Sequence, residues 1–412
     1  MALAPLVDEV LGGDLPVAVE AYDGSLAGPA DARTTLGIVS PDALRRIITA
    51  PGELGLARAY VAGDLTVEGD IWDLIALRDR MPNVKLSPGM MLKLVGELGG
   101  WREIHRVDPP QEEARLHGRR HSRARDAAAV GHHYDVSNAF YRMVLGPSMT
   151  YSCAVFGDLS DSLEQAQANK YELICRKLGL QSGMRLLDVG CGWGGMAMHA
   201  ARHHGVRAVG ITISARQAEL AEKRVGEAGL SDQVEIRLQD YREVTDGPYD
   251  AVSSIGMFEH VGEAKLGEYF GRLRHLLRPG GRLLNHGISR PPGQRARLPR
   301  NSFINRYVFP DGELHEVGRV VSMVQAAGFE VRHVESLREH YAETLRRWVA
   351  NLEGHWDEAV EEVGAARARV WRLYMAGSSV NFAAGRNQIH QVLATPVTPD
   401  GDSGMPLRPE FH

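Results

Sequence analysis

Over about its last 230 residues, the chain alternates short apolar runs with segments whose apolar positions recur at helical spacing. This order is typical of a sheet built from strand–helix–strand units. We predict seven strands, at Met184–Gly190, Arg207–Ile213, Val234–Gln239, Tyr249–Gly256, Gly281–Gly287, Phe329–Ser336 and Gln388–Leu393. The turn "RPGG" at Arg278–Gly281 should end a helix and start the fifth strand. The pattern therefore predicts an α/β fold with a doubly wound, parallel seven-stranded sheet.

The upstream residues show a weaker pattern. Residues 1 to about 84 mix helical segments, such as "SPDALRRIITA", with short apolar runs, and they contain no catalytic spacing. A polar connection follows from about 85 to 130, with dense positive charge in "RLHGRRHSRAR" at Arg115–Arg125. A solvated linker and a contact with an anionic surface both fit this charge. We expect a smaller N-terminal domain and basic linker over residues 1–125, and a larger domain over residues 126–412.

Composition narrows the class of protein. The chain has 412 residues, 44% of them hydrophobic, and a net charge of −5, which argues against a dedicated nucleic-acid binder. Cys153, Cys175 and Cys191 show neither paired metal spacing nor an even count, so we expect a reducing cytosol, no disulfide framework and no zinc site. No apolar stretch approaches about 18 residues, and "MALAPLVDEV" lacks the features of a signal peptide.

The first predicted strand runs directly into a glycine-rich turn in "LLDVGCGWGG", Leu186–Gly195. Its glycines allow a sharp turn and a close approach to a ligand, while the following helix offers free N–H groups. The glycine spacing is not that of a dinucleotide-binding turn, and Asp188 would repel a pyrophosphate. A fixed carboxylate before the turn suits a ligand with a cationic amino-acid end. The turn therefore predicts a site for S-adenosylmethionine.

Several motifs, in the same order along the chain, resemble one family, the cyclopropane-fatty-acyl-phospholipid synthases and the related mycolic acid methyltransferases. These motifs are "HHYDVSNAFYRMVL", "MTYSCAVF", "LLDVGCGWGG", "GITISARQ", "LQDYRE", "SIGMFEHVG" and "NRYVFPDGEL". The resemblance covers about residues 130–395 and implies a class I S-adenosylmethionine-dependent C-methyltransferase over the larger domain.

The resemblance extends beyond the larger domain. Gly52–Asp70 is similar to the N-terminal domain of the phospholipid-acting members, which the mycolic acid enzymes lack, and this favours a phospholipid substrate. The segments "LREHYAETLRRWVANL" and "ARVWRLYMAGS" resemble an actinobacterial branch, some of whose members make 10-methylene-branched chains instead of cyclopropanes.

The resemblance also implies a set of cofactor-binding residues. Tyr151 and Ser152 would hold the methionine carboxylate, and Thr212 and Gln217 would reach the ribose. The turn would wrap the amino-acid end and the ribose with Asp188, Gly190, Cys191, Gly192 and Gly194, and the adenine would lie between Asp240 and Tyr241.

An isolated double bond is a weak nucleophile, so methyl transfer to it creates a carbocation that must be kept from water and must later lose a proton. In the family a bound bicarbonate serves as the base, and the matching residues here are Cys153, Glu259, His286 and Tyr341. His133, with Tyr134, would close the active site or serve a structural role. His132 and His133 have no third metal ligand in spacing. Ser378 stands where some members have a cysteine, which excludes thiolate catalysis at that position.

Other enzyme classes share this fold. A methyltransferase for a nitrogen or oxygen nucleophile is the alternative, but "GMFEHVG" at the fourth strand end lacks the N/D-P-P-Y/F element of amine-methylating enzymes. A lipid-binding protein without catalysis is a third class, and the cofactor and anion residues argue against it. We expect an unsaturated acyl chain and the inner face of the cell membrane as partners, with no nucleic acid. The basic stretch Ser289–Arg300 is a second candidate for lipid contact. The sequence leaves open the product, the acyl chain, the headgroup and the oligomeric state.

Overall fold

The computed structural model describes residues 2–10, 13, 16–80, 88–114, 136–294, 297–299, 301–310 and 312–411. The chain forms two compact units. The first comprises Met1–Arg115, Pro299–Pro310 and His355–Val380, and the second comprises Leu116–Leu298, Asp311–Gly354 and Asn381–His412. The boundary expected at residues 125 and 126 lies outside the described residues. Pro299–Pro310 and His355–Val380 also belong to the first unit, so a single boundary along the chain does not separate the two units.

The second unit is built on a mixed sheet that, within the described residues, has seven strands in the order β10-β11-β9-β8-β5-β6-β7. These strands are β5 (Arg185–Val189), β6 (Arg207–Thr212), β7 (Val234–Leu238), β8 (Tyr249–Ile255), β9 (Leu277–Ser289), β10 (Glu330–Ser336) and β11 (Gln388–Thr395). All seven predicted strands are confirmed, to within a few residues at their ends.

Two details of the sheet differ from the prediction. Strand β11 runs antiparallel to both of its neighbours, β9 and β10, so the sheet is not wholly parallel. The apolar run of a strand buried on both faces does not record its direction, which explains the error. Strand β9 also begins at Leu277 and includes the "RPGG" turn, with a register shift against β8 between Tyr249 and Ala251. The irregular pairing accommodates a proline and two glycines that the pattern assigned to a turn.

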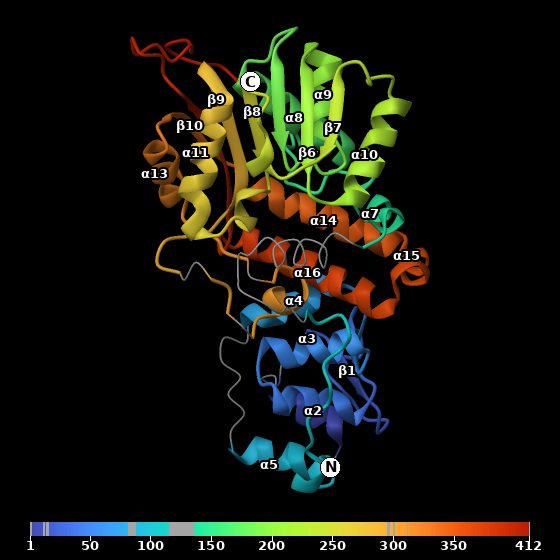
Figure 1. Ribbon diagram of the computed structural model, residues 1–412. Helices are drawn as coiled ribbons and strands as arrows, with labels where there is room; N and C mark the ends of the chain where they lie inside the picture. The colour runs from blue at the N-terminus through green and yellow to red at the C-terminus, as the bar shows by residue number, and fades with distance from the viewer. Residues whose placement is uncertain are drawn as a thin grey trace. The chain divides into compact units, whose positions relative to one another are not determined.

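Helices cover both faces of this sheet (Figure 1). One face packs against α8 (Leu163–Leu178), α9 (Gly195–His204) and α10 (Ala215–Glu227), and the other against α11 (Leu266–Leu276) and α13 (Val317–Ala326). The strands alternate between the two cores, since Leu186 belongs to the first and Leu187 to the second. Both leucines are fully buried.

The remaining elements of the second unit border the strand ends that carry the site. They are α7 (Asn138–Leu145), α14 (Arg338–Gly354), η2 (Tyr241–Glu243), η3 (Phe258–His260) and η4 (Glu263–Lys265). Ser137 caps the N-terminus of α7 by accepting hydrogen bonds from the amides of Ala139 and Phe140. Helix α14 packs on α7, and Asn351 Nδ2 donates to Val144 O over 2.9 Å.

The first unit contains a small sheet in the order β2-β1-β3-β4. Its elements are α1 (Leu3–Val10), β1 (Ala18–Ala21), β2 (Leu26–Ala27), β3 (Thr35–Ile38), α2 (Pro41–Thr49), α3 (Glu53–Ala62), β4 (Leu65–Glu68), α4 (Ile71–Arg80), α5 (Pro88–Glu97), η1 (Trp101–Glu103), α12 (Phe303–Tyr307), α15 (Trp356–Val363) and most of α16 (Ala365–Ala383). Arg58 and Glu113 form a buried two-point ion pair, with both N–O distances at 2.8 Å.

Two sequence expectations concern this unit. Helix α2 confirms the helical pattern in "SPDALRRIITA", and Ser40 caps it. Helix α5 occupies part of the segment described as a polar connection, because Leu94 and Val95 give it a buried apolar side. Among the described residues of the whole chain, no helix combines the length and apolar character needed to cross a bilayer.

Candidate active site

The second unit contains a cavity at the carboxyl ends of β5, β6, β7 and β8, where open α/β sheets bind their ligands. The glycine-rich turn after β5 forms one wall. Gly190 and Gly192 adopt left-handed φ values of 78° and 54°, which glycine allows without strain. A Cβ at Gly192 would meet no atom within 4 Å, so the turn presents open space toward the cavity.

A buried carboxylate and a buried amine share this cavity. Asp188 is 2% exposed, and it accepts a hydrogen bond of 2.7 Å from Ser253 Oγ. Burial raises the pKa of Asp188 to about 6, against the opposing effects of Ser253 and Lys170. Lys170, on α8, is fully buried, and its Nζ donates to Ser152 Oγ over 2.9 Å. Burial lowers the pKa of Lys170 to about 7. Near neutral pH the site therefore offers a carboxylate and an amine whose protonation would change when a charged ligand binds.

The end of β6 provides a second pair of polar groups. Thr212 Oγ1 donates to Gln217 Oε1 over 2.8 Å, and Thr212 Oγ1 also accepts from the amide of Ser214. Ser214 in turn caps α10 by accepting from the amide of Gln217. These contacts hold Thr212 and Gln217 in place at the cavity wall before any ligand binds.

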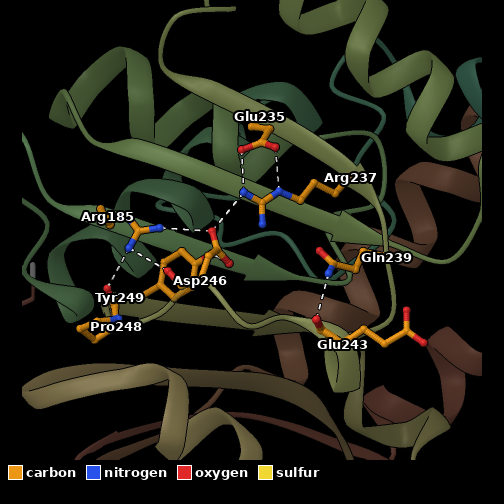
Figure 2. A network of polar contacts seen from close by, with 8 residues as sticks. All are labelled: Arg185, Glu235, Arg237, Gln239, Glu243, Asp246, Pro248 and Tyr249. Atoms are coloured by element: carbon orange, nitrogen blue, oxygen red, sulfur yellow. Dashed lines mark hydrogen bonds and ion pairs between the residues drawn. The ribbon is translucent and has the colours of Figure 1, made fainter.

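The segment after β7 forms the third wall. Asp240 accepts from Arg242, at 2.8 Å from Nε and 2.5 Å from a terminal nitrogen, and Arg242 also lies over the Tyr241 ring. Gln239 Nε2 donates to Glu243 O over 3.1 Å, which fixes both ends of the 3₁₀ turn η2 (Figure 2).

Figure 2 also shows how the chain beyond η2 is anchored to the sheet. Asp246 accepts from Arg237 on β7, from Arg185 at the start of β5 and from Tyr249 Oη on β8, at 3.1, 3.3 and 2.8 Å. Three strands thus position the loop that carries Asp240 and Tyr241.

The cavity brings together ten of the eleven residues that the sequence predicted for the cofactor. Gly194 does not line the cavity; it forms the N-cap of α9 with φ of 80°. Other lining residues were not predicted from the sequence, among them Met149, Thr150, Lys170, Tyr171, Gln239, Arg242, Met257, His260 and Lys265. Lys170 has a signal in the sequence, because it falls within the buried stripe of α8, where a lysine is unexpected.

The residues predicted to hold an anion lie beside this cavity. Cys153 follows Tyr151 and Ser152, and Glu259 lies between Met257 and His260, all four of which line the cavity. His286 lies on β9, two residues before Ile288, whose amide donates to Glu259 Oε1 over 2.7 Å. Glu259 and His286 are thereby tied to the same strand end.

Cys153 and Tyr341 are linked to that strand end through Leu337. The Cys153 thiol donates to Leu337 O over 3.6 Å, and the amide of Tyr341 donates to the same oxygen over 3.1 Å. The amide of Leu337 donates to Ile389 O, and Ile389 pairs with Ile288 in the sheet. The backbone thus places all four predicted residues around the carboxyl end of β9.

Three atoms of this group lack hydrogen-bond partners among the described residues: Glu259 Oε2 and both ring nitrogens of His286. His286 is 1% exposed, so bulk water cannot freely supply the hydrogen bonds that its ring nitrogens lack. Burial raises the pKa of Glu259 to about 7, so its carboxyl is protonated in part near neutral pH, and burial lowers the pKa of His286, which favours the neutral imidazole. A protonated carboxyl and a neutral imidazole each donate one hydrogen bond, and such donors suit a small buried anion.

Other predicted residues have different outcomes. His132, His133, Tyr134 and Arg115–Arg125 lie outside the described residues. Ser378 is buried in α16. In the second basic stretch, Arg290 pairs with Glu316 and Arg297 with Glu313, both at 2.9 Å, so these two arginines already have carboxylate partners.

The fold, the glycine turn with its preceding carboxylate, and the polar groups at the ends of β6 and β7 define an S-adenosylmethionine-dependent methyltransferase. The chain belongs to the mycolic acid cyclopropane synthetase family, whose pattern matches residues 121–392. It is 50% identical over 408 residues to a probable fatty acid methyltransferase of Mycobacterium tuberculosis, covering 96% of this chain and 95% of that protein.

Two further similarities place the chain within the family. It is 34% identical over 373 residues to the cyclopropane-fatty-acyl-phospholipid synthase of Escherichia coli, covering 90% of this chain and 89% of that enzyme. The crystal structure of a mycolic acid cyclopropane synthase complexed with SAH and CTAB matches with a TM-score of 0.61 and 34% identity, covering 65% of this chain and 98% of that one.

Proposed function

We propose that the enzyme transfers a methyl group from S-adenosylmethionine to the cis double bond of an unsaturated phospholipid acyl chain. The similarity to an acyl-phospholipid synthase supports this substrate, because it spans 90% of the chain and so includes part of the first unit. The mycolic acid enzyme, which acts on a different lipid, covers only 65%.

The observation that carries the proposal is the buried group of Glu259 and His286 with its unpartnered atoms. A methyltransferase for an amine or a hydroxyl removes a proton from the nucleophile before or during transfer. An alkene has no such proton, and its methylation leaves a carbocation that must lose one. A buried anion held beside the cofactor cavity stabilises that cation and then accepts the proton.

The cofactor supplies a methyl group activated by the positive sulfonium. We assign Asp188 to the cationic ammonium end of its amino acid and Lys170, with Ser152, to the carboxylate, because a buried group gains most from a partner of opposite charge. Thr212 and Gln217 would bind the ribose, and Tyr241 offers a flat face to the adenine.

For the anion we propose bicarbonate, held by Cys153, Glu259, His286 and Tyr341. The two buried nitrogens of His286 and the carboxyl of Glu259 are the groups that still need a partner. The planar ion would accept hydrogen bonds from the neutral side chains and take the proton from the newly added methyl group. Glu259 would then relay the proton outward, since its pKa of about 7 suits transfer in either direction.

The test is turnover on vesicles of mono-unsaturated phospholipid with trideuteromethyl cofactor, followed by mass spectrometry of the lipid. Two deuterons should remain on the added carbon, within a ring if the product is a cyclopropane and in a terminal alkene if a hydride shift precedes proton loss. A deuterated methyl found on nitrogen or oxygen would overturn the proposal.

Glu259→Gln should lower kcat by roughly 10²- to 10⁴-fold, the loss expected for an acid–base group. Cofactor affinity, measured by calorimetry, should stay within a few-fold, because Glu259 does not line the cofactor cavity. Glu263→Gln, on the exposed 3₁₀ turn η4, is a matched control and should keep near-normal turnover. Near-normal turnover in Glu259→Gln would exclude the anion site proposed here.

Lipid contact at the inner face of the membrane is also a proposal. Cosedimentation with neutral and anionic vesicles at two salt concentrations tests it, because binding through arginines weakens as salt screens the charges. Equal binding under all four conditions would exclude an electrostatic contact.

A further inference from the structure

A second cluster of reactive side chains lies away from the cofactor cavity, where α8 packs against α9 (Figure 1). Cys175 on α8 and His199 and His204 on α9 each bring a potential ligand atom within 4.8 Å of the other two. Residues of both helices are described throughout this region. One thiol and two imidazoles at this spacing are the ligand types that bind zinc in proteins.

Glu172 supplies a fourth donor. Its Oε2 lies 3.0 Å from His204 Nε2 and 3.5 Å from His199 Nε2. Two ligands of a tetrahedral zinc ion at about 2.0–2.1 Å from the metal are about 3.3 Å apart, so the Glu172 oxygen already lies at a suitable separation from each of the two imidazole nitrogens. Glu172 and Cys175 are three residues apart and therefore project from the same side of α8.

We propose that Glu172, Cys175, His199 and His204 form a tetrahedral binding site for zinc. On binding, the Cys175 sulfur would become a metal-bound thiolate and the thiol proton would pass to solvent. No oxidation or reduction is involved. The mixture of one sulfur, two nitrogens and one oxygen favours zinc over the hard cations magnesium and calcium.

The surroundings of the cluster fit a metal that enters from solvent. The side chains of Glu172, His199 and His204 are 33%, 14% and 18% exposed, while Cys175 is buried behind them. Arg176 binds the other carboxylate oxygen, Oε1, at 2.8 Å and so orients Glu172.

The site would link two helices that also border the cofactor cavity. Helix α8 carries Lys170, and α9 begins at Gly195 and Met196, which line the cavity. Because a bound metal would add a cross-link between α8 and α9, it should raise thermal stability without taking part in the reaction.

The test uses untagged full-length protein stripped with a chelator and titrated with zinc in competition with a chromophoric chelator. One equivalent should bind, and Cys175→Ala or His204→Asn should each weaken binding by at least about 100-fold. His275→Asn is the matched control: this exposed histidine on α11 is not one of the clustered ligands, and its loss should leave the affinity within a few-fold.

X-ray absorption at the zinc edge gives a second readout that does not depend on variants. It should show one sulfur at about 2.3 Å and three nitrogen or oxygen atoms at about 2.0–2.1 Å. A spectrum without sulfur, or unchanged affinity in both ligand variants when circular dichroism shows them folded, would overturn the proposal. In that outcome Glu172 serves only as a hydrogen-bond partner for two histidines.

Discussion

Replacing Lys170 with methionine should stabilise the fold and impair the enzyme. The Lys170 amine is fully buried, and its pKa falls from the ordinary 10.5 to about 7. Each pKa unit corresponds to about 1.36 kcal/mol, so burying this amine, which is protonated in the unfolded chain, costs roughly 4 kcal/mol at pH 7 and roughly 2 kcal/mol at pH 9. At Lys170 the unfolded chain binds more protons than the folded one between pH 7 and pH 10.5, so the destabilisation caused by this residue decreases as pH rises across this range.

Methionine removes that cost while keeping an unbranched side chain of similar length. Asp188 loses its cationic neighbour in the variant, and the further rise in its pKa takes back up to about 1 kcal/mol. The net gain at pH 7 is then about 3 kcal/mol. At roughly 2 to 4 °C per kcal/mol for a unit of this size, Tm should rise by at least about 6 °C.

Thermal unfolding followed by near-ultraviolet circular dichroism, without cofactor, measures this change at pH 7 and pH 9. The gain in Tm should be smaller at pH 9. Lys223→Met is the control, because that side chain is 69% exposed and its replacement should move Tm little. Calorimetry should show weaker S-adenosylmethionine binding in Lys170→Met only. A variant that melts at or below the wild-type temperature at both pH values would refute the reasoning, since Lys170 would then be stabilised by its surroundings.

The remaining predictions concern the glycine turn and the strand that supports Glu259. Asp188→Ala should weaken S-adenosylmethionine binding by about 1 to 3 kcal/mol in calorimetry, the scale of a lost charge-assisted hydrogen bond, and unchanged affinity in a folded variant would remove Asp188 from the cofactor site. Gly287→Ala should destabilise the second unit by at least about 2 kcal/mol in thermal unfolding, because a Cβ there would lie 1.9 Å from the Phe258 ring and displace η3; a Tm within 2 °C of wild type would contradict this.

The sheet was predictable because its strands are short apolar runs separated by amphipathic helices, and both patterns can be recognised in the sequence. The direction of β11 was not, since it depends on where the chain returns to the sheet after α14, α15 and α16. The grouping of residues 355–380 with the N-terminal unit has the same origin. A local sequence pattern shows which face of a helix or strand is buried. It does not show which distant segment of the chain packs on that face.

Most of the residues predicted for the cofactor follow strands whose carboxyl ends meet at one edge, which is why the prediction from sequence falls on the lining of one cavity. Lys170 was missed because its role depends on burial, and a lysine in a helix is usually exposed. The proposed zinc site was not predicted for a related reason. Closely spaced cysteines are the usual sequence sign of a zinc site, whereas here Cys175 lies near histidines that are 24 and 29 residues further along the chain, on a neighbouring helix.

Several costly features gather at the carboxyl edge of the sheet. Met149 adopts a left-handed φ of 53°, Lys170 carries a buried amine, and His286 has two buried nitrogens without partners among the described residues. Each feature destabilises the folded chain, and such features persist where a ligand later supplies the missing interaction. Met149 and Lys170 line the cofactor cavity, while His286 lies beside it. The destabilising features are therefore divided between the cofactor cavity and the proposed anion site. This division supports the proposal that a second, anionic group binds next to the cofactor.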